Sequence, residues 1–152
     1  SYLNVILAQM EVVESGKETD ISSTLHELAD RIKKRGLIIL ISDLFDDQDA
    51  VISGLKHFRH KKHEVLVFHL MDMQEKTLDY DRQVRLTDLE SGENITTEPK
   101  LIREAYSDEV EKFIETYRIE CLSNHIDYTH ITTDQSFELA LTEYLNKRQK
   151  LI

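Results

Sequence analysis

The sequence is poor in the residues that build disulfides, cysteine metal sites and membrane spans. Of its 152 residues only Cys121 is a cysteine, which excludes an internal disulfide and a zinc site built from cysteines. A reducing compartment is the simplest assignment for such a chain. No apolar run approaches the roughly 20 residues that a membrane-spanning helix needs, and no signal-peptide pattern is present. We therefore expect a cytoplasmic protein without a membrane segment in this chain, and tethering through a segment outside it stays open.

Glycine and positive charge are also scarce. The four glycines, Gly16, Gly36, Gly54 and Gly92, stand far apart, so the chain has no glycine-rich loop that could hold a phosphate. With 19 basic against 29 acidic side chains, the formal net charge is −10. A field of this sign repels phosphate backbones, so we expect no nucleic-acid partner. No serine or cysteine has the local sequence of an activated nucleophile, and we expect no enzyme.

The composition is that of a folded globular protein. Hydrophobic residues make up 40% and charged residues 32% of the chain. A chain of this length buries roughly 70% of its unfolded surface, so residues 1–152 are expected to form a single domain. The chain lacks an initiator methionine and opens with residues typical of a helix interior. We therefore expect it to be a fragment of a longer domain whose N-terminal strands are missing.

Two unbroken apolar runs of strand length cover residues 37–41 and 65–70. Runs of this kind are typical of strands buried on both faces of a parallel sheet that helices cover. A third strand is predicted over residues 126–131, and helical periodicity lies between the strands. This alternation predicts an α/β fold with a doubly wound, mostly parallel, three-layer sheet, a partial Rossmann-like arrangement.

The pattern changes after Asp72. Residues 83–89 alternate, residues 90–93 have turn chemistry and residues 94–97 can return, which predicts a small added β-hairpin. Apolar residues then recur at helical spacing from about 100 to 124, and Pro99 stands where the first turn of a helix tolerates proline. Further helices are predicted before the first strand, after it, and at the end of the chain.

Polar residues stand where the predicted strands end. In a doubly wound sheet, ligands collect outside the carboxyl ends of the strands. Asp43 follows the first strand, Asp72 the second and residues 132–134 the third, and Thr19 leads into the helix before the first strand. Oxygen ligands of this kind suit Mg²⁺. The structural alternative is that Thr19 and Asp43 only cap a helix and a turn, and residue statistics alone favour it.

Histidines offer a second set of candidate ligands. His57, His60 and His63 recur at intervals of three, but Arg59 and neighbouring lysines would repel a cation, so we interpret the segment as a solvated basic turn. His69 stands late in an apolar strand and is predicted to be a core histidine.

An ordered set of short motifs runs along nearly the whole chain. The set comprises Gly16-x-x-Thr19-Asp20, residues 37–47, Gly54-Leu55, residues 63–72 with Glu75, residues 88–93, Ile126-Asp127-Tyr128, and Ala140-Leu141 with Tyr144-Leu145 and Arg148. No single motif is specific. In this order, however, the motifs resemble the bacterial family called domain of unknown function 58 (DUF58).

That family is similar to von Willebrand factor A (vWA) domains, which have a doubly wound fold and a metal-ion-dependent adhesion site (MIDAS). By this resemblance Thr19 and Asp43 correspond to two of the metal ligands. The rim of the binding face then consists of Ser42, Asp46, Asp47 and Asp72. The Asp-x-Ser-x-Ser loop that supplies the other ligands is absent from this chain. The resemblance thus implies the C-terminal half of a vWA-like domain, with Mg²⁺ in the intact domain and no cofactor in this fragment.

The resemblance implies a protein-interaction module. DUF58 members are often encoded beside MoxR-type AAA+ ATPases, so the expected partner is such an ATPase and the expected role is assembly or maturation of other proteins. Two alternatives stay open. Asp43 could accept a phosphoryl group as in receiver domains, although the last strand ends without the lysine that receivers need. Alternatively, carboxylates could serve a metal-dependent hydrolase, and these would be Asp43, Asp46, Asp47 and Asp72.

The missing first strand also has a structural consequence. In vWA-like domains that strand lies beside the one predicted over residues 37–41. Without it, an apolar strand edge is left open, and open edges of this kind pair with other chains. We therefore expect either a homodimer through residues 37–41 or another chain that covers the edge.

Overall fold

The computed structural model describes residues 2–12, 20–87 and 94–149. The helices are α1 (Tyr2–Val12), α2 (Ile21–Arg31), α3 (Gln48–His60), α4 (Met73–Thr77), α5 (Pro99–Ser123) and α6 (Phe137–Gln149). The strands are β1 (Leu37–Ser42), β2 (Glu64–Met71), β3 (Val84–Thr87), β4 (Asn94–Thr97) and β5 (Asp127–Thr132). The three predicted core strands and the long helix are confirmed, whereas the short helix α4 was not predicted.

The strands β1, β2 and β5 form one parallel sheet in the order β1-β2-β5. Phe68 at the centre of β2 pairs with Ile41 on one side and with Thr129 on the other. The strands β3 and β4 form a separate antiparallel hairpin, which confirms that prediction, although its turn over residues 88–93 lies outside the described residues. The chain is therefore an α/β protein with a small parallel sheet and an added hairpin.

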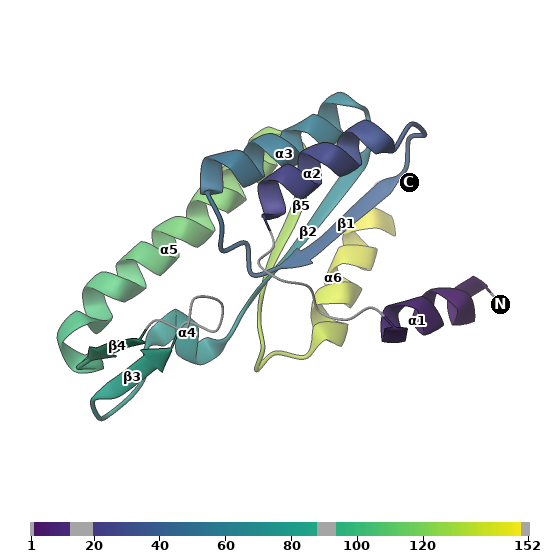
Figure 1. Cartoon of the computed structure of the whole chain (residues 1–152). Coiled ribbons are helices and arrows are strands. Elements are labelled where there is room, and N and C mark those ends of the chain that lie inside the picture. Colours follow the sequence, from purple (N-terminus) through teal and green to yellow (C-terminus); the bar gives the residue numbers. More distant parts are fainter. Residues whose placement is uncertain (1, 13–19, 88–93, 150–152) are drawn as a thin grey trace.

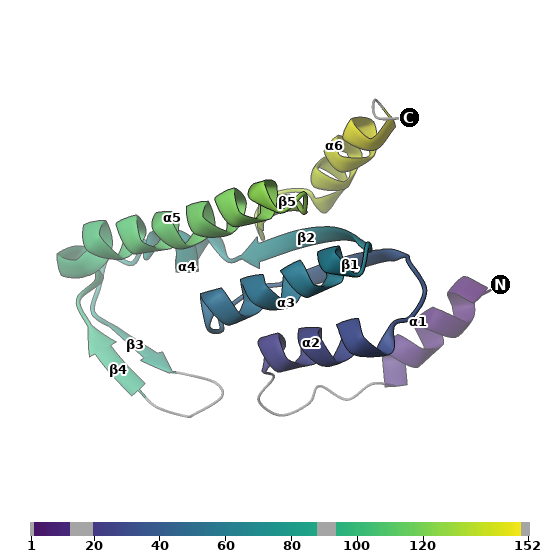
Figure 2. The same ribbon diagram turned by 90° about the horizontal axis from the view of Figure 1, so that it is seen from above.

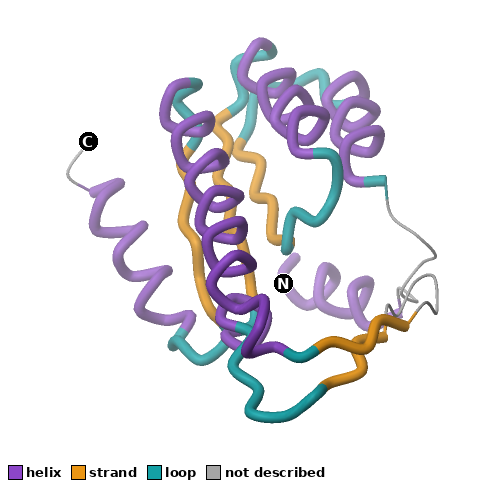
Figure 3. The backbone as a smooth tube through the Cα atoms, turned by 90° about the vertical axis from the view of Figure 1, so that its left-hand side faces the viewer, coloured by secondary structure: helices purple, strands orange, loops and turns teal. Residues whose placement is uncertain are grey.

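Helices lie on both faces of the sheet (Figure 1). The main core lies between the sheet and the helices α2, α3 and α5, and Leu55, Phe58, Val67 and Tyr117 are among its fully buried side chains. A smaller core on the opposite face joins Leu66, Phe68 and Ile131 to Tyr144 of α6. Figure 3 shows α5 running along the strands, with α6 on their other side. The predicted three-layer arrangement is confirmed.

The prediction that residues 37–41 are buried on both faces is wrong. Ile38 and Leu40 pack against the main core, but Leu37, Ile39 and Ile41 on the other face are 43%, 51% and 62% exposed. The reason is the position of α6, which packs against β5 and β2 and leaves the adjoining face of β1 uncovered. The face of β1 that continues the smaller core is therefore open.

Helix α1 contributes nothing to either core. Its periodicity predicted a helix and that prediction is confirmed, yet none of its residues is buried. Figures 1 and 2 show it apart from the sheet and from α2. Within the described ranges, no helix is both long and apolar enough to cross a bilayer.

The helices α2 and α3 pack closely because α3 carries a glycine at their contact. A Cβ atom built on Gly54 would lie 2.8 Å from the Cβ atom of Leu25. Leu25 and Ala29 supply the buried side of α2. The small residue lets the two helices approach each other beside the sheet.

The interpretation of residues 57–63 as a solvated basic turn is wrong for two of its histidines. His63 is only 1% exposed, and its Nδ1 atom accepts a hydrogen bond from the backbone N–H of Gly36 at 3.2 Å. His57 lies against His26, 3.1 Å between their Nδ1 atoms, and 3.5 Å from a carboxylate oxygen of Asp30. His57 thus links α3 to α2, and His63 links the end of α3 to the start of the sheet. In the described ranges, neither belongs to a group of three or more histidine, cysteine or acidic side chains arranged to hold a metal ion.

The first half of α5 extends beyond the sheet. After Pro99, the first buried residue of this helix is Val110, and Leu101 is 79% exposed. Figure 2 shows this end of α5 beside the hairpin, away from the three strands. Arg103 holds the preceding loop there, because it donates to the carbonyl oxygens of Leu78 and Tyr80 at 3.3 and 3.1 Å.

Candidate functional site

The carboxyl ends of the three parallel strands meet at one edge of the sheet, as the topology predicts. The Thr133 hydroxyl donates to Oδ2 of Asp72 at 2.7 Å, and the Thr133 backbone N–H donates to the carbonyl oxygen of Met71 at 3.1 Å. The segments that follow β2 and β5 are therefore in direct contact. We call this edge, with the loop after β1, the carboxyl rim.

The loop after β1 is held by hydrogen bonds within the loop and by one from α5. Leu44 has a left-handed backbone with φ of 60° and a fully buried side chain, and its carbonyl oxygen accepts from the Tyr117 hydroxyl at 3.2 Å. Its backbone N–H donates to the Ser42 hydroxyl at 3.1 Å. Asp43 is exposed, and its Oδ1 accepts a bond of 3.3 Å from the Phe45 backbone N–H. The buried Leu44 thus fixes the direction in which Asp43 leaves the sheet.

Asp46 and Asp47 have their carboxylates directed at helix N-termini. Oδ2 of Asp46 accepts from the backbone N–H groups of Ile21 and Ser22 at 2.9 and 3.2 Å, so it satisfies the start of α2 from a distant loop. Asp47 is the N-cap of α3, and its Oδ1 accepts from the Ala50 backbone N–H at 2.8 Å. Both residues lie on the rim, as predicted, but their carboxylates cap helix N-termini there.

Asp72 begins α4 with a reciprocal capping box. Its Oδ1 accepts from the Gln74 backbone N–H at 2.8 Å, while the Glu75 side chain accepts from the Asp72 backbone N–H at 3.2 Å. The hydrogen bonds from Thr133 and Gln74 hold the pKa of the Asp72 carboxyl below its usual value. Asp72 therefore stays ionised and joins the ends of two strands.

Thr19, the other predicted metal ligand, lies outside the described residues. The neighbouring Asp20 is the N-cap of α2, since its Oδ1 accepts from the Ser23 backbone N–H at 2.8 Å. The meeting of Thr19 with Asp43 stays a prediction.

A groove lies between the loop after β1 and the middle of α5. Its volume is about 400 Å³. The Phe45 ring, 55% exposed, stacks on Phe113 with their centroids 5.6 Å apart. The remaining lining residues are Gln48, Tyr106, Glu109, Val110, Lys112 and Thr116. The sequence analysis missed Phe45, although an aromatic residue between Asp43 and the pair Asp46 and Asp47 was a signal for it.

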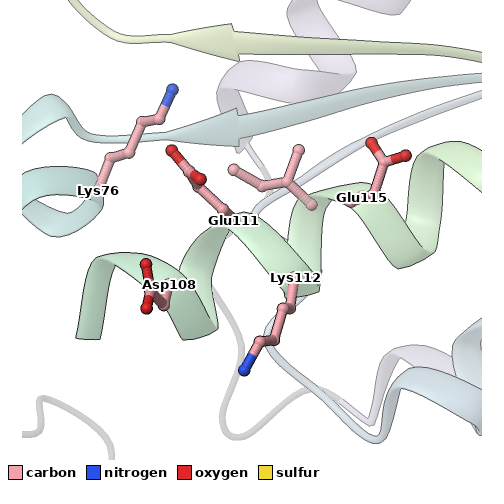
Figure 4. Close-up of a pocket in the computed structure, with 6 residues that line it drawn as sticks. Lys76, Asp108, Glu111, Lys112 and Glu115 are labelled. Carbon is pink, nitrogen blue, oxygen red and sulfur yellow. The ribbon is translucent and has the colours of Figure 1, made fainter. Parts of the chain in front are cut away.

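A second pocket of about 520 Å³ lies between α4 and α5. Figure 4 shows Lys76 on α4 opposite Glu111 on α5, with further charges of both signs along the helix. Lys112 is paired with Glu109 at 2.7 Å. Because positive and negative side chains alternate here, the pocket has no clear preference for a ligand of one charge.

His69 lies beneath the rim, in the core, as predicted. It is fully buried, and its Nδ1 atom is 2.6 Å from the Tyr128 hydroxyl. Desolvation lowers the pKa of His69 to about 4, so the ring is neutral at pH 7. Its Nε2 atom has no hydrogen-bond partner among the described residues. The neutral His69 ring contacts the rings of Phe113 and Tyr117, so its role is to pack in the core.

Cys121 is buried in α5, and burial raises the pKa of its thiol to about 12. The thiolate that nucleophilic catalysis needs is therefore not formed near neutral pH.

One comparison with known proteins identifies the family. The family model described as "Protein of unknown function DUF58" matches residues 2–115. The chain belongs to the DUF58 family. Neither the curated proteins nor the solved structures include a match to it. The resemblance predicted from the ordered motifs is confirmed at the level of the family, and the matched residues include the loop after β1 and Asp72.

The rim of this DUF58 chain was predicted to take part in a magnesium site. Asp43 offers an exposed carboxylate next to the Ser42 hydroxyl, and oxygen donors of this kind suit Mg²⁺. Asp46, Asp47 and Asp72 are turned to backbone N–H groups. No group of three or more acidic, histidine or cysteine side chains among the described residues is arranged to hold a metal ion. Asp43 alone does not complete a site, and magnesium binding by the intact domain stays a prediction.

The DUF58 rim thus combines a rigid acidic loop with an aromatic groove. Asp43 projects from the end of β1, and Phe45 lines the groove two residues later. The loop between them is fixed by the buried Leu44. Such an arrangement can bind a partner at low entropic cost, because the contact residues are already ordered.

Proposed function

We propose that this DUF58 chain is a protein-interaction module that works through its carboxyl rim. One observation carries the proposal: of the four rim aspartates, Asp46, Asp47 and Asp72 bond to helix N-termini and fix the surface, whereas Asp43 is exposed and bonds to the Phe45 backbone N–H within its own loop. A rim of this kind is suited to recognition by a surface of fixed shape and charge.

The chemistry of the rim favours binding over catalysis. General acid–base catalysis works best with a group whose pKa is near the operating pH. Asp72 has a pKa below its usual value, and the buried His69 has a pKa of about 4. Neither group is poised to exchange a proton near neutral pH.

The proposed partner is a MoxR-type AAA+ ATPase, in the assembly or maturation of other proteins. This part of the proposal is supported by membership of the DUF58 family, whose members are often encoded beside such ATPases. In the intact domain Thr19 and Asp43 would hold Mg²⁺, whose open position accepts a carboxylate of the partner. The metal would reverse the local charge of an acidic surface. The Phe45 groove beside it would accept an apolar side chain of the partner.

The test measures binding of the intact DUF58 protein to the purified MoxR-type ATPase encoded beside it. Biolayer interferometry is run with Mg²⁺ and with EDTA, on the wild type and on Asp43→Asn and Phe45→Ala. Asp134→Asn is the matched control, because Asp134 is an exposed aspartate at the same end of the sheet. We expect each of the two test variants to weaken binding at least about tenfold, equivalent to about 1.4 kcal/mol.

Chelation should weaken binding by the wild type and leave that by Asp43→Asn unchanged. Equal affinity of the wild type, Asp43→Asn and Phe45→Ala for the ATPase would contradict the proposed surface. Loss of binding in Asp134→Asn to the same extent would show a general effect of charge.

A further inference from the structure

We propose that a basic pocket at the end of the molecule opposite the carboxyl rim binds a phosphate monoester group. The pocket has a volume of about 370 Å³ and lies between the C-terminal ends of α2 and α3. Small-molecule sites begin at roughly 300 Å³, so it is large enough for such a ligand. The proposal is independent of the ATPase and of magnesium, because it uses none of the rim residues. The pocket is lined by Ile32, Lys33, His60, Lys61 and Lys62.

The topology of the sheet collects basic residues at this end. The parallel strands β1 and β2 begin at the same edge, so the loops that lead into them lie side by side. The backbone N–H of Glu64 donates to the carbonyl oxygen of Gly36 at 3.0 Å, and the backbone N–H of Gly36 donates to Nδ1 of His63 at 3.2 Å. Figure 1 shows α2 and α3 ending at this edge, away from the arrowheads of the strands. We call residues 31–36 and 56–63, which share this surface, the basic pole.

The basic pole concentrates the positive charge of an acidic chain. It contains eight of the 19 lysines and arginines, whereas all 29 acidic residues lie outside it. The acidic rim is at the other end of β1, which has six residues and so spans about 20 Å. This distance is more than twice the Debye length of about 8 Å at physiological ionic strength. The carboxylates of the rim are therefore largely screened from the pole.

Most of the cations of the pole already have partners. Lys56 pairs with Glu120 at 2.8 Å, and Lys61 pairs with Asp30 at 2.7 Å. Arg59 donates to two backbone carbonyl oxygens. These contacts join neighbouring elements, so we assign their side chains to the fold and not to a ligand. The remaining pairs are Arg31 with Glu27 and Arg35 with Glu64.

Three lysines of the pole are left for an anion. Lys33, Lys34 and Lys62 are exposed and form no ion pair in the part of the chain that the structure describes. The helices α2 and α3 both end here, and each helix end carries a partial charge of about −0.5. One lysine is enough to offset both helix ends. A net positive charge therefore remains at the pocket, where Lys33 and Lys62 are lining residues.

Lys62 occupies a position that the turn itself would give to glycine. Helix α3 ends in a Schellman motif, in which the backbone N–H of His63 donates to the carbonyl oxygen of Phe58 at 3.1 Å. The residue after the C-cap of this motif has a left-handed backbone, and Lys62 has φ of 66°. Glycine adopts this conformation without the penalty of a Cβ atom. The turn does not need the lysine, and a role in binding accounts for it.

A phosphate monoester fits this pocket better than a nucleic acid does. Such a group carries a charge of about −1.5 to −2 at pH 7 and three acceptor oxygens, which match the ammonium groups of two lysines. None of the lining residues in the described ranges is a phenylalanine, tyrosine or tryptophan on which a base could stack. The group can belong to a soluble molecule or to the headgroup of a membrane lipid, and the test separates these two sources.

Isothermal titration calorimetry of the intact protein with glycerol 3-phosphate tests the soluble source, and glycerol is the uncharged control. Flotation with vesicles tests the lipid source. The vesicles contain phosphatidylcholine with phosphatidic acid, whose headgroup is the same phosphate monoester, and vesicles of phosphatidylcholine alone are the control. We expect binding to glycerol 3-phosphate, to the vesicles with phosphatidic acid, or to both, and to neither control.

Two variants test whether the pocket is the site. Lys33→Gln and Lys62→Gly should each weaken binding at least about threefold, and the double variant at least about tenfold. Lys100→Gln is the matched control and should keep the wild-type affinity, because it removes an exposed lysine at the start of α5. Lys62→Gly should also have a melting temperature no lower than that of the wild type, because glycine suits the left-handed position. Loss of binding is thereby separated from loss of folding.

A wild-type protein that binds neither glycerol 3-phosphate nor the vesicles with phosphatidic acid would overturn the proposal. So would unchanged binding in the double variant, or an equal loss of binding in Lys100→Gln. Tighter binding of a DNA oligonucleotide than of either phosphate ligand would assign the pole to nucleic acid instead. ATPase binding is not measured in these experiments, so their failure would leave the proposed function standing.

Discussion

Asp46 shows at the scale of one residue how the rim is built. It is separated from Ile21 and Ser22 by more than twenty residues, yet its Oδ2 atom satisfies both of their backbone N–H groups. The residue therefore caps α2 from another loop. From the sequence, Asp46 was assigned to a binding face because it is acidic. The sequence does not show which backbone N–H groups its carboxylate bonds to in the fold.

The prediction for Asp46 concerns stability. Asp46→Ala removes two hydrogen bonds at the N-terminus of α2 and should lower the free energy of unfolding by about 1–2 kcal/mol, the usual cost of losing such a cap. Urea unfolding followed by circular dichroism measures the change. Asp134→Ala, an exposed control at the same edge, should change it by less than about 0.5 kcal/mol. Equal stability of the wild type and Asp46→Ala would contradict the capping role.

His69 should make the stability of the protein depend on pH. Its pKa is lowered to about 4 in the folded state by desolvation, from a usual value of 6.5. Between these values the unfolded chain binds the proton and the folded chain does not. The contribution of neutral His69 to the free energy of unfolding is therefore fully present above pH 6.5 and is lost as the pH falls toward 4. The loss is on the order of 3 kcal/mol.

The variant His69→Asn removes the titrating group and should flatten the dependence of the unfolding free energy on pH between 4 and 6.5. Urea unfolding at several pH values measures the slope. Burial lowers the pKa of His130 as well, so a smaller slope of the same sign should remain. The control His60→Asn changes an exposed residue and should keep the wild-type slope. An unchanged slope in His69→Asn would contradict the assignment.

At the scale of helices and strands, the sequence predicted what depends on local pattern. The apolar runs that became β1 and β2 and the alternation that became β3 were visible, because burial imposes periodicity. The sequence did not show that one face of β1 is left uncovered, since this depends on where α6 packs. Helix α4 was missed because its start depends on the bond of Asp72 to Gln74 in a segment of five residues. At the site, proximity of Asp72 and Thr133 followed from the topology, but the groove at Phe45 did not.

The contact between α2 and α3 gives a prediction at this scale. Gly54→Ala should destabilise the fold by about 1–3 kcal/mol, despite the better helix propensity of alanine, because the added methyl group meets Leu25. Gly36→Ala is the control, since a Cβ atom there would have nothing within 4 Å. Thermal unfolding of both variants measures the difference. A Gly54→Ala protein at least as stable as the wild type would show that α2 moves away freely.

At the scale of the whole molecule, the two edges of the sheet and its two faces are unequally protected. The face covered by α2, α3 and α5 holds the main core, while in the part of the chain that the structure describes α6 alone packs on the other face. The open part of that second face is at β1, next to the open edge. Strand β1 therefore combines an uncovered face with an end that leads into the proposed rim.

The overhang of α5 divides the molecule into parts of different local stability. Residues 101–109 have no sheet beneath them, whereas the second half of the helix, with Tyr117 and Cys121, packs in the core. Backbone amides in the overhang and in the β3–β4 hairpin should exchange with deuterium at least about tenfold faster than those of residues 113–121. Arg103→Ala should quicken exchange further in the overhang alone. If so, the second half of α5 unfolds only with the whole protein. The first half unfolds and refolds locally while the rest of the protein stays folded.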